Sequence, residues 1–188
     1  MRKPSWTLLL VAALGLAACE TPITAHHEYD KRARFNEFTE FAWVTNEPLI
    51  HPSPGLDPRL SPVIEKTIRA AIERNLIEKG YTRIAEARSA DVVLSFSVGT
   101  REKIEVDSYP VLGGYRYGAR GAWVSDVHSY TEGILAIDVF EVHSKQVVWH
   151  GWAAETLSPS ADQEKREENI NRVVDAILAE FPFRNTLR

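Results

Sequence analysis

The sequence predicts a single α+β domain, built mainly from an antiparallel β-sheet with two α-helices packed on one face. Two stretches have helical periodicity, and other stretches have the strict apolar–polar alternation of strands. Their order along the chain is strand, helix, several strands, helix. Packing both helices on one face of the sheet is the simplest way to bury both apolar helix stripes. A length of 188 residues fits one domain, and an apolar content of 44% can form a core.

The first predicted elements are a strand and a loop. Phe35, Phe38, Phe41 and Trp43 are aromatic residues that favour a strand, although their three-residue spacing would also suit a helix. The apolar run is short and proline-rich sequence follows it, so we predict a strand. Residues 46–62 contain five prolines and are expected to form a loop.

The clearest helix follows this loop. Its apolar residues recur at three- and four-residue steps and define one face: Leu60, Ile64, Ile68, Ala71, Ile72 and Leu76. Either Asp57-Pro58 or Ser61-Pro62 can begin it, because both pairs combine a capping side chain with proline at the first helical position. Gly80 can end it.

The central part of the chain predicts strands. Residues 91–99 alternate cleanly, with Leu94, Phe96 and Val98 on one face, and the strand can continue through Ile104 and Val106. Residues 131–141 and 146–154 form a further pair of strands with a short turn near 143–145. Residues 131–141 carry apolar side chains on both faces, which indicates an interior strand or a partly covered second face.

The last predicted element is a helix from about Asp162 to Phe181, and Pro182 ends it. Acidic residues are concentrated in its first turns, where they interact favourably with the positive end of the helix dipole. Its buried stripe consists of Ile170, Val173, Val174, Ile177, Leu178 and Phe181.

The N-terminal 18 residues differ in composition from the rest of the chain and have the pattern of a targeting segment. Arg2 and Lys3 precede an uncharged, mostly apolar run over residues 6–18, which is typical of an export signal and shorter than the roughly 20 residues of a membrane-spanning helix. The run ends in Leu16-Ala17-Ala18-Cys19, which resembles the lipobox of bacterial lipoproteins. The alternatives are a soluble export signal with a coincidental cysteine, or an anchor that is not cleaved.

The lipobox resemblance implies cleavage before Cys19, a lipid on its thiol and acylation of the new N-terminus. Glu20, where an aspartate would favour the inner membrane, implies the outer membrane. We therefore predict a signal peptide at 1–18, a lipidated tether at 19–28 and one periplasmic domain at 29–188.

Composition excludes several functions. Loss of the two basic residues of the leader changes the net charge from −4 to −6, so no nucleic-acid partner is expected. One cysteine excludes an internal disulfide framework and a cysteine-based zinc cluster.

Four stretches of the mature chain carry a family likeness, over about residues 29–182. They are Tyr29-Asp30 with residues 35–43; residues 76–81 leading to Ala90-Asp91-Val92-Val93; residues 130–138 followed by Val148-Trp149-His150-Gly151-Trp152-Ala153; and the final helix ending Phe181-Pro182. In these the chain resembles bacterial lipoproteins of the domain of unknown function 4136 (DUF4136) family. The resemblance implies an envelope lipoprotein with an α+β fold, and it brings no established activity, cofactor or catalytic residues.

The most unusual segment runs from residue 109 to 123. Glycines 113, 114, 118 and 121 are interleaved there with aromatic and basic residues: Tyr109, Tyr115, Arg116, Tyr117, Arg120 and Trp123. Glycine allows close approach, while Tyr, Trp and Arg offer amphipathic contact and planar hydrogen bonding. The segment could grip a protein, a glycan or lipid head groups; alternatively, it is a hairpin tip whose aromatic rings fold back on the sheet. Its glycines lack the strand–loop–helix context of a dinucleotide-binding motif.

Two other groups of residues suggest chemistry weakly. His26-His27-Glu28 with Asp30 could bind zinc or copper, but a polar tether is the simpler interpretation. Asp138 is expected to pair with a lysine or arginine or to face water, and His150 is interpreted as a strand residue and not a catalyst. There is no Gly-x-Ser-x-Gly elbow and no His-Glu-x-x-His pair, and the only thiol is assigned to lipid.

The tryptophans have two interpretations as well. Trp43, Trp149 and Trp152 could form a platform for a ligand, but packing in the core or at the sheet edge is the simpler role.

Together these observations predict a lipoprotein of the outer membrane, facing the periplasm, that acts without catalysis or cofactor as an interaction or envelope-maintenance module. Its expected partners are the membrane, through the lipid on Cys19, and an envelope protein or glycan. The alternative is a periplasmic protein that binds glycan or lipid fragments through residues 109–123.

Overall fold

The computed structural model describes residues 22–47, 49–50, 61–111, 122–158 and 160–182. Within these ranges, six strands and two helices follow one another along the chain. They are β1 (Ala25–Tyr29), β2 (Glu40–Trp43), α1 (Pro62–Glu78), β3 (Thr82–Arg83), β4 (Val92–Val111), β5 (Ala122–Glu141), β6 (Val147–Thr156) and α2 (Gln163–Leu178). In the described part of the chain, no helix is long and apolar enough to span a bilayer.

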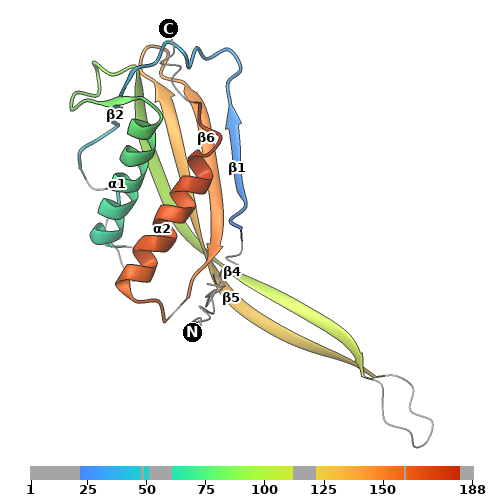
Figure 1. Ribbon diagram of the computed structural model, residues 1–188. Coiled ribbons are helices and arrows are strands. Elements are labelled where there is room, and N and C mark those ends of the chain that lie inside the picture. Colours follow the sequence, from blue (N-terminus) through green and yellow to red (C-terminus); the bar gives the residue numbers. More distant parts are fainter. Residues whose placement is uncertain (1–21, 48, 51–60, 112–121, 159, 183–188) are drawn as a thin grey trace, which may run out of the picture.

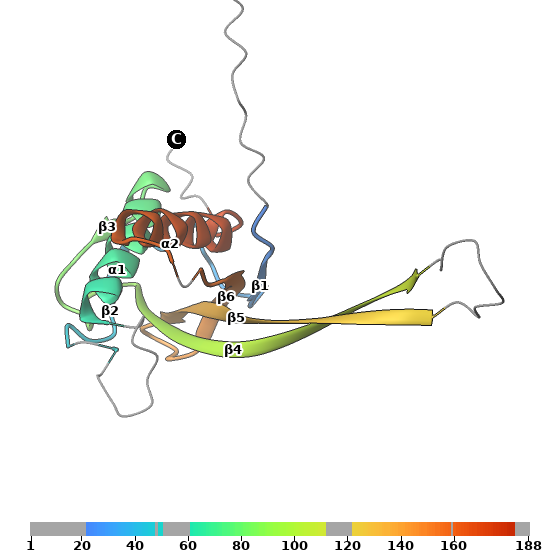
Figure 2. The same ribbon diagram turned by 90° about the horizontal axis from the view of Figure 1, so that it is seen from below.

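The six strands form one sheet in the order β1-β6-β5-β4-β2-β3. The neighbours β1, β6, β5 and β4 pair antiparallel with one another, whereas β2 lies parallel to both β4 and β3. Both helices cover the same face of this sheet (Figures 1 and 2). The predicted fold class, a mainly antiparallel sheet with two helices on one face, is confirmed.

The core lies between this face and the helices. Strand residues alternate toward it, and the largest fully buried side chains come from every layer: Trp149, Phe41, Phe181, Ile72, Leu76, Leu94, Ile137, Ile177 and Leu178. Phe181, just beyond α2, meets Trp149 edge-on with ring centroids 5.2 Å apart. The predicted apolar stripes of both helices therefore face the sheet.

Local capping fixes both helix starts. Ser61 caps α1 with Pro62 at the first position, so the structure selects the second of the two predicted starts. The backbone N–H of Lys165 donates to Asp162 Oδ1 at 2.9 Å, which caps α2. Gly80, with φ of 94°, follows α1 in the left-handed conformation expected after a helix.

Two predicted boundaries are wrong. Residues 25–28, assigned to the tether, belong to β1, which pairs with β6 from Ala25↔Ala153 to Tyr29↔Trp149. The predicted strand at 35–43 is confined to Glu40–Trp43, because Phe35 lies in a turn and Phe38 in the irregular segment before β2, from where Phe38 enters the core and Phe35 packs against it. The backbone N–H groups of Thr39 and Glu40 donate to the Asp91 carboxylate at 2.7 and 2.9 Å, so this aspartate fixes the start of β2.

The two central strands continue far beyond their neighbours. β4 and β5 are 20 residues long and pair throughout, but β2 accompanies β4 only to Leu94 and β6 accompanies β5 only to Glu132. Beyond these points a two-stranded ribbon projects from the body (Figures 1 and 2). We call residues 101–111 and 122–131 the arm; at about 3.3 Å per residue it is roughly 35 Å long.

Candidate interaction site

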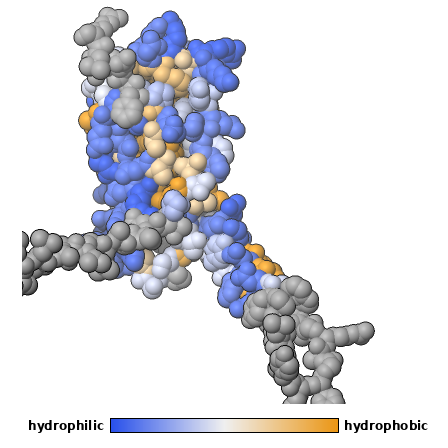
Figure 3. Space-filling view, turned by 45° about the vertical axis from the view of Figure 1, so that its right-hand side comes forward, coloured by the Kyte–Doolittle hydropathy of each residue, from blue (hydrophilic) through white to orange (hydrophobic). Residues whose placement is uncertain are grey.

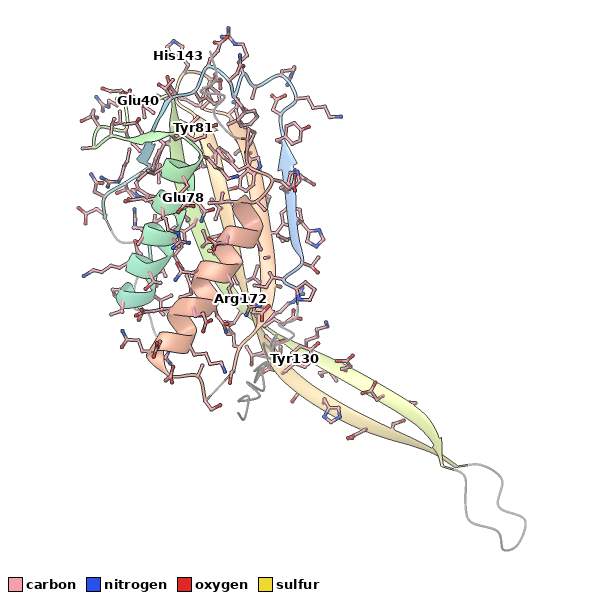
Figure 4. The ribbon with its side chains drawn as sticks, in the orientation of Figure 1. Glu40, Glu78, Tyr81, Tyr130, His143 and Arg172 are labelled. Carbon is pink, nitrogen blue, oxygen red and sulfur yellow. The ribbon has the colours of Figure 1, made fainter. Side chains whose placement is uncertain are left out.

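A charged cluster marks the place where the arm leaves the body, and Figure 4 labels Tyr130 there. Arg101 lies opposite Glu132, with Nη2 2.6 Å from Oε2, and Lys103 Nζ lies 3.4 Å from Glu132 Oε1. Hydrogen bonding from Arg101, followed by Lys103, lowers the pKa of Glu132 despite its burial. Tyr130 and then Glu132 raise the pKa of Lys103. The cluster therefore stays charged at neutral pH.

One face of the arm exposes an apolar stripe. Ile104, Val106 and Val127 are 67%, 56% and 60% exposed, and Val106 lies directly opposite Val127. Figure 3 shows hydrophobic atoms on the surface of the arm. Serines 108, 125 and 129 flank the stripe on the same face. A contiguous apolar patch on a projecting element is typical of an interaction surface.

The other face of the arm is charged. Beyond the charged cluster at its root, this face carries the side chains of Glu105, Asp107, Asp126 and His128, and all four are exposed. His128 Nε2 lies 3.2 Å from Asp126 Oδ2. The arm is therefore amphipathic across its two faces, although neither face is covered by another described element.

The predicted binding segment, residues 109–123, lies next to this stripe, but the stripe itself was not predicted. The six residues named for it are Tyr109, Tyr115, Arg116, Tyr117, Arg120 and Trp123. Residues 115, 116, 117 and 120 lie outside the described residues, and for 109 and 123 only the backbone, in β4 and β5, is described. A signal for the stripe was present, because the predicted strand at 91–99 could continue through Ile104 and Val106, which is longer than the neighbouring strand predicted at 146–154.

The family-like stretch Trp149-His150-Gly151-Trp152 divides its side chains between the two faces of the sheet. Trp149 points into the core and lies over Gly151, where an added Cβ would come within 2.1 Å of the indole ring. Trp43 is also buried, and its Nε1 donates to Glu73 Oε1 at 2.7 Å. These two tryptophans are packing residues and do not form a platform.

The opposite face carries a small aromatic and polar cluster. Trp152 stacks with His26 of β1 and with His150, with centroid separations of 5.3 and 5.0 Å. His150 Nδ1 lies 2.6 Å from Asp138 Oδ1 on the neighbouring strand. The partner of Asp138 is thus a histidine, which the sequence did not predict.

The N-terminal histidines do not converge. His26 and His27 point to opposite faces of β1, because successive side chains of a strand alternate. His26 contacts Trp152, whereas the His27 ring lies 6.5 Å from that of Trp149. Among the described residues, no group of three or more His, Cys, Asp or Glu side chains could hold a metal ion.

These features define a class: a two-layer α+β domain in which the two central strands continue as an arm. The family described as "Domain of unknown function (DUF4136)" matches residues 25–183, so the chain belongs to this family. The match begins at the first residue of β1, in agreement with the corrected boundary of the domain.

Solved structures resemble the fold at low sequence identity. A PDZ domain protein from Parabacteroides distasonis ATCC 8503 matches with a TM-score of 0.55 and 16% identity over 86% of this chain. This chain spans only 36% of that protein. No protein of curated function matches the chain in sequence.

Two further structures match less closely in shape. The PelC dodecamer from Paraburkholderia phytofirmans has a TM-score of 0.45 and 14% identity over 83% of this chain and 94% of that one. A DUF4136 family protein from Bacteroides thetaiotaomicron VPI-5482 has a TM-score of 0.44 and 18% identity over 86% of this chain and 95% of that one.

Proposed function

We propose that this chain is a lipoprotein of the outer membrane, facing the periplasm, that acts without catalysis as an interaction or envelope-maintenance module. The arm is its contact element. The single observation that carries the proposal is the exposed stripe of Ile104, Val106 and Val127 on a ribbon that no other described element covers.

The energetics of the arm support a role in binding. A two-stranded ribbon is at best marginally stable alone in water, because it buries little apolar surface. Both edges of the arm are free of strand partners among the described residues, so their backbone groups are available to a strand of another protein. A partner that covers the stripe and extends an edge would stabilise the arm.

Lipid anchorage rests on the sequence of the leader. Residues 1–21, with Cys19 among them, lie outside the described part of the chain. The start of β1 at Ala25 leaves five residues, 20–24, between it and Cys19, so the two positions can lie at most about 20 Å apart at roughly 3.3 Å per residue step. Ala25 pairs with Ala153, and Ala153 with Leu135, close to the root of the arm. Anchorage would therefore hold this end of the body near the bilayer.

Crosslinking in cells tests the role of the arm. A photoreactive amino acid at Val106, and separately at Val127, should capture the same envelope protein. The matched control is Val147, which is 45% exposed at the other end of the body. The triple variant Ile104→Ser, Val106→Ser, Val127→Ser should lose the partner in co-purification while keeping its stability. Equal capture from Val147 would contradict the proposal.

A separate experiment tests the anchor. Cys19→Ala should release the chain from the membrane fraction and remove the lipid mass from its N-terminal peptide. Unchanged membrane retention, with no lipid on the wild-type peptide, would exclude the lipoprotein.

The second candidate function is binding of a glycan or lipid fragment. The sequence predicts that site at residues 109–123. A cavity inside the described body favours the lipid version of this function at another place.

A further inference from the structure

An apolar cavity of about 130 Å³ lies between the sheet and both helices, at the end of the body from which the arm leaves. Ile64 and Ile68 of α1 form one wall, Val98 and Leu135 form the floor, and Ile170 and Val173 of α2 form the other wall. A cavity of roughly 150 Å³ with similar lining binds benzene in an engineered protein. This cavity therefore has room for a short segment of hydrocarbon chain.

Glycines shape the cavity. An added Cβ at Gly133 would lie 2.8 Å from Leu157 Cδ2, so the missing side chain lets Leu157 close against β5 as part of the lining. Gly99 also lines the cavity, but only through its backbone, because its position alternates with the helix-facing Val98 and Thr100 along β4.

The open side of the cavity is polar. Its exposed lining residues are Thr100, Ser158 and Arg166, and Glu155 is half-buried beside them. The guanidinium of Arg166 has no salt-bridge partner among the described residues. A cation on the same rim as two hydroxyl groups suits a carboxylate. The Glu155 carboxylate on that rim repels every anion, and anions of higher charge more strongly, so a single carboxylate is the anion that fits best.

We propose that this cavity binds a fatty acid, with the hydrocarbon chain between α1, α2 and the sheet and the carboxylate at Arg166. The site goes beyond the proposed role of the arm, and it relies on the proposed anchorage only for a nearby source of ligand. The distal part of the chain lies outside the cavity, because a volume of about 130 Å³ holds only a short segment.

Photolabelling of the purified full chain carrying Cys19→Ala tests the site. An octanoate probe with an alkyl diazirine should label the peptides of β4, α1 and α2 that line the cavity, and excess octanoate should suppress the labelling while butyrate does not. Val98→Phe should fill the cavity and reduce labelling several-fold, whereas the matched control Val147→Phe should not. Ile64→Phe fills the same space from α1 and keeps the test available if Val98→Phe does not fold.

Arg166→Gln tests the position of the carboxylate. It should reduce labelling by the acid several-fold and leave labelling by the methyl ester of the same probe unchanged. The serine triple variant of the arm should label like the parent chain, so failure of the arm hypothesis leaves this result intact. Labelling that is absent, or that is spread over the arm and unaffected by Val98→Phe, would overturn the fatty-acid site.

Discussion

The body and the arm are built from the same two strands and differ in what covers them. In the body, the helix-side residues of β4 and β5 are buried: Leu94 is 1% exposed, and Ile137 and Val139 are 0% exposed. In the arm, Ile104, Val106 and Val127 continue the same faces of the same strands and are more than half exposed. The helices and the flanking strands end before the arm begins.

This difference separates residues that hold the fold from residues that are free to bind. Burial of an apolar side chain stabilises the folded state in proportion to the area removed from water. An apolar side chain in the arm stays in water in the isolated chain, so it contributes little stabilisation there. It can be buried, and so contribute, when a partner binds. Substitutions of one chemical kind should therefore have unequal effects in the two regions.

The largest expected contrast is between two aliphatic residues of β5. Ile137→Ala should lower the free energy of unfolding by about 2–5 kcal/mol, because it opens a cavity in the closed core. Val127→Ala in the arm should change it by less than about 0.5 kcal/mol. Denaturant unfolding monitored by circular dichroism measures both. Equal losses would show that the arm is packed in solution.

Two glycines test the contrast between a backbone position packed against a side chain and one that faces open space. Gly151→Ala places a methyl group against the buried Trp149 ring and should destabilise the protein by about 1–3 kcal/mol. Gly99→Ala, where β4 reaches the open end of the body, meets no atom within 4 Å and should be neutral or slightly stabilising. Thermal melts of the two variants decide; a destabilised Gly99→Ala with an unaffected Gly151→Ala would contradict this packing.

A buried glutamate and an exposed one extend the comparison to charge. Glu65 is 4% exposed and accepts hydrogen bonds from the backbone N–H groups of Leu49 and Ile50 and from Arg69 Nε, all within 3.0 Å. Glu65→Gln should cost about 1–2 kcal/mol, because a neutral acceptor binds these donors less well. Glu105→Gln in the arm should have no measurable effect on unfolding.

The same glutamate predicts the direction of a pH effect. Burial acts to raise the pKa of Glu65, but the hydrogen bonds from Ile50, Leu49 and Arg69 outweigh it and hold the pKa below the ordinary value. A lowered pKa in the folded state means that the contribution is complete above the unfolded pKa and is lost as pH falls through the folded one. Stability should therefore fall less steeply in acid for Glu65→Gln than for the parent chain, as measured by unfolding at a series of acidic pH values.

The smallest expected effect on stability belongs to the whole stripe. The variant Ile104→Ser, Val106→Ser, Val127→Ser should retain the melting temperature of the parent within a few degrees, because these side chains are already in water. A large drop in melting temperature would assign the stripe to folding, and retained partner capture would remove it from the binding surface.

Local sequence predicted much of the body, and its failures have specific causes. The helices were predictable because their apolar stripes and caps lie within a few residues of one another. β1 was missed because His26, His27 and Glu28 have no alternating apolar pattern; this strand exists through its backbone pairing with β6. Phe140 pairs with Val147 next to the turn between β5 and β6, and a regular ladder from this pair would place Asp138 opposite Trp149. An irregularity between Val139 and Phe140 shifts the pairing by one residue. That shift brings Asp138 opposite His150.

The sequence by itself determined the fold class, the two helices with their buried faces and the alternation of the central strands, because each depends on local periodicity and turn chemistry. Only the tertiary structure decided where along β4 and β5 the apolar side chains stop being covered by other elements. Coverage depends on where α1, α2, β2 and β6 end relative to β4 and β5, and these are contacts between residues far apart in the chain. The same pattern of apolar residues is therefore a core at Leu94 and an exposed stripe at Val106.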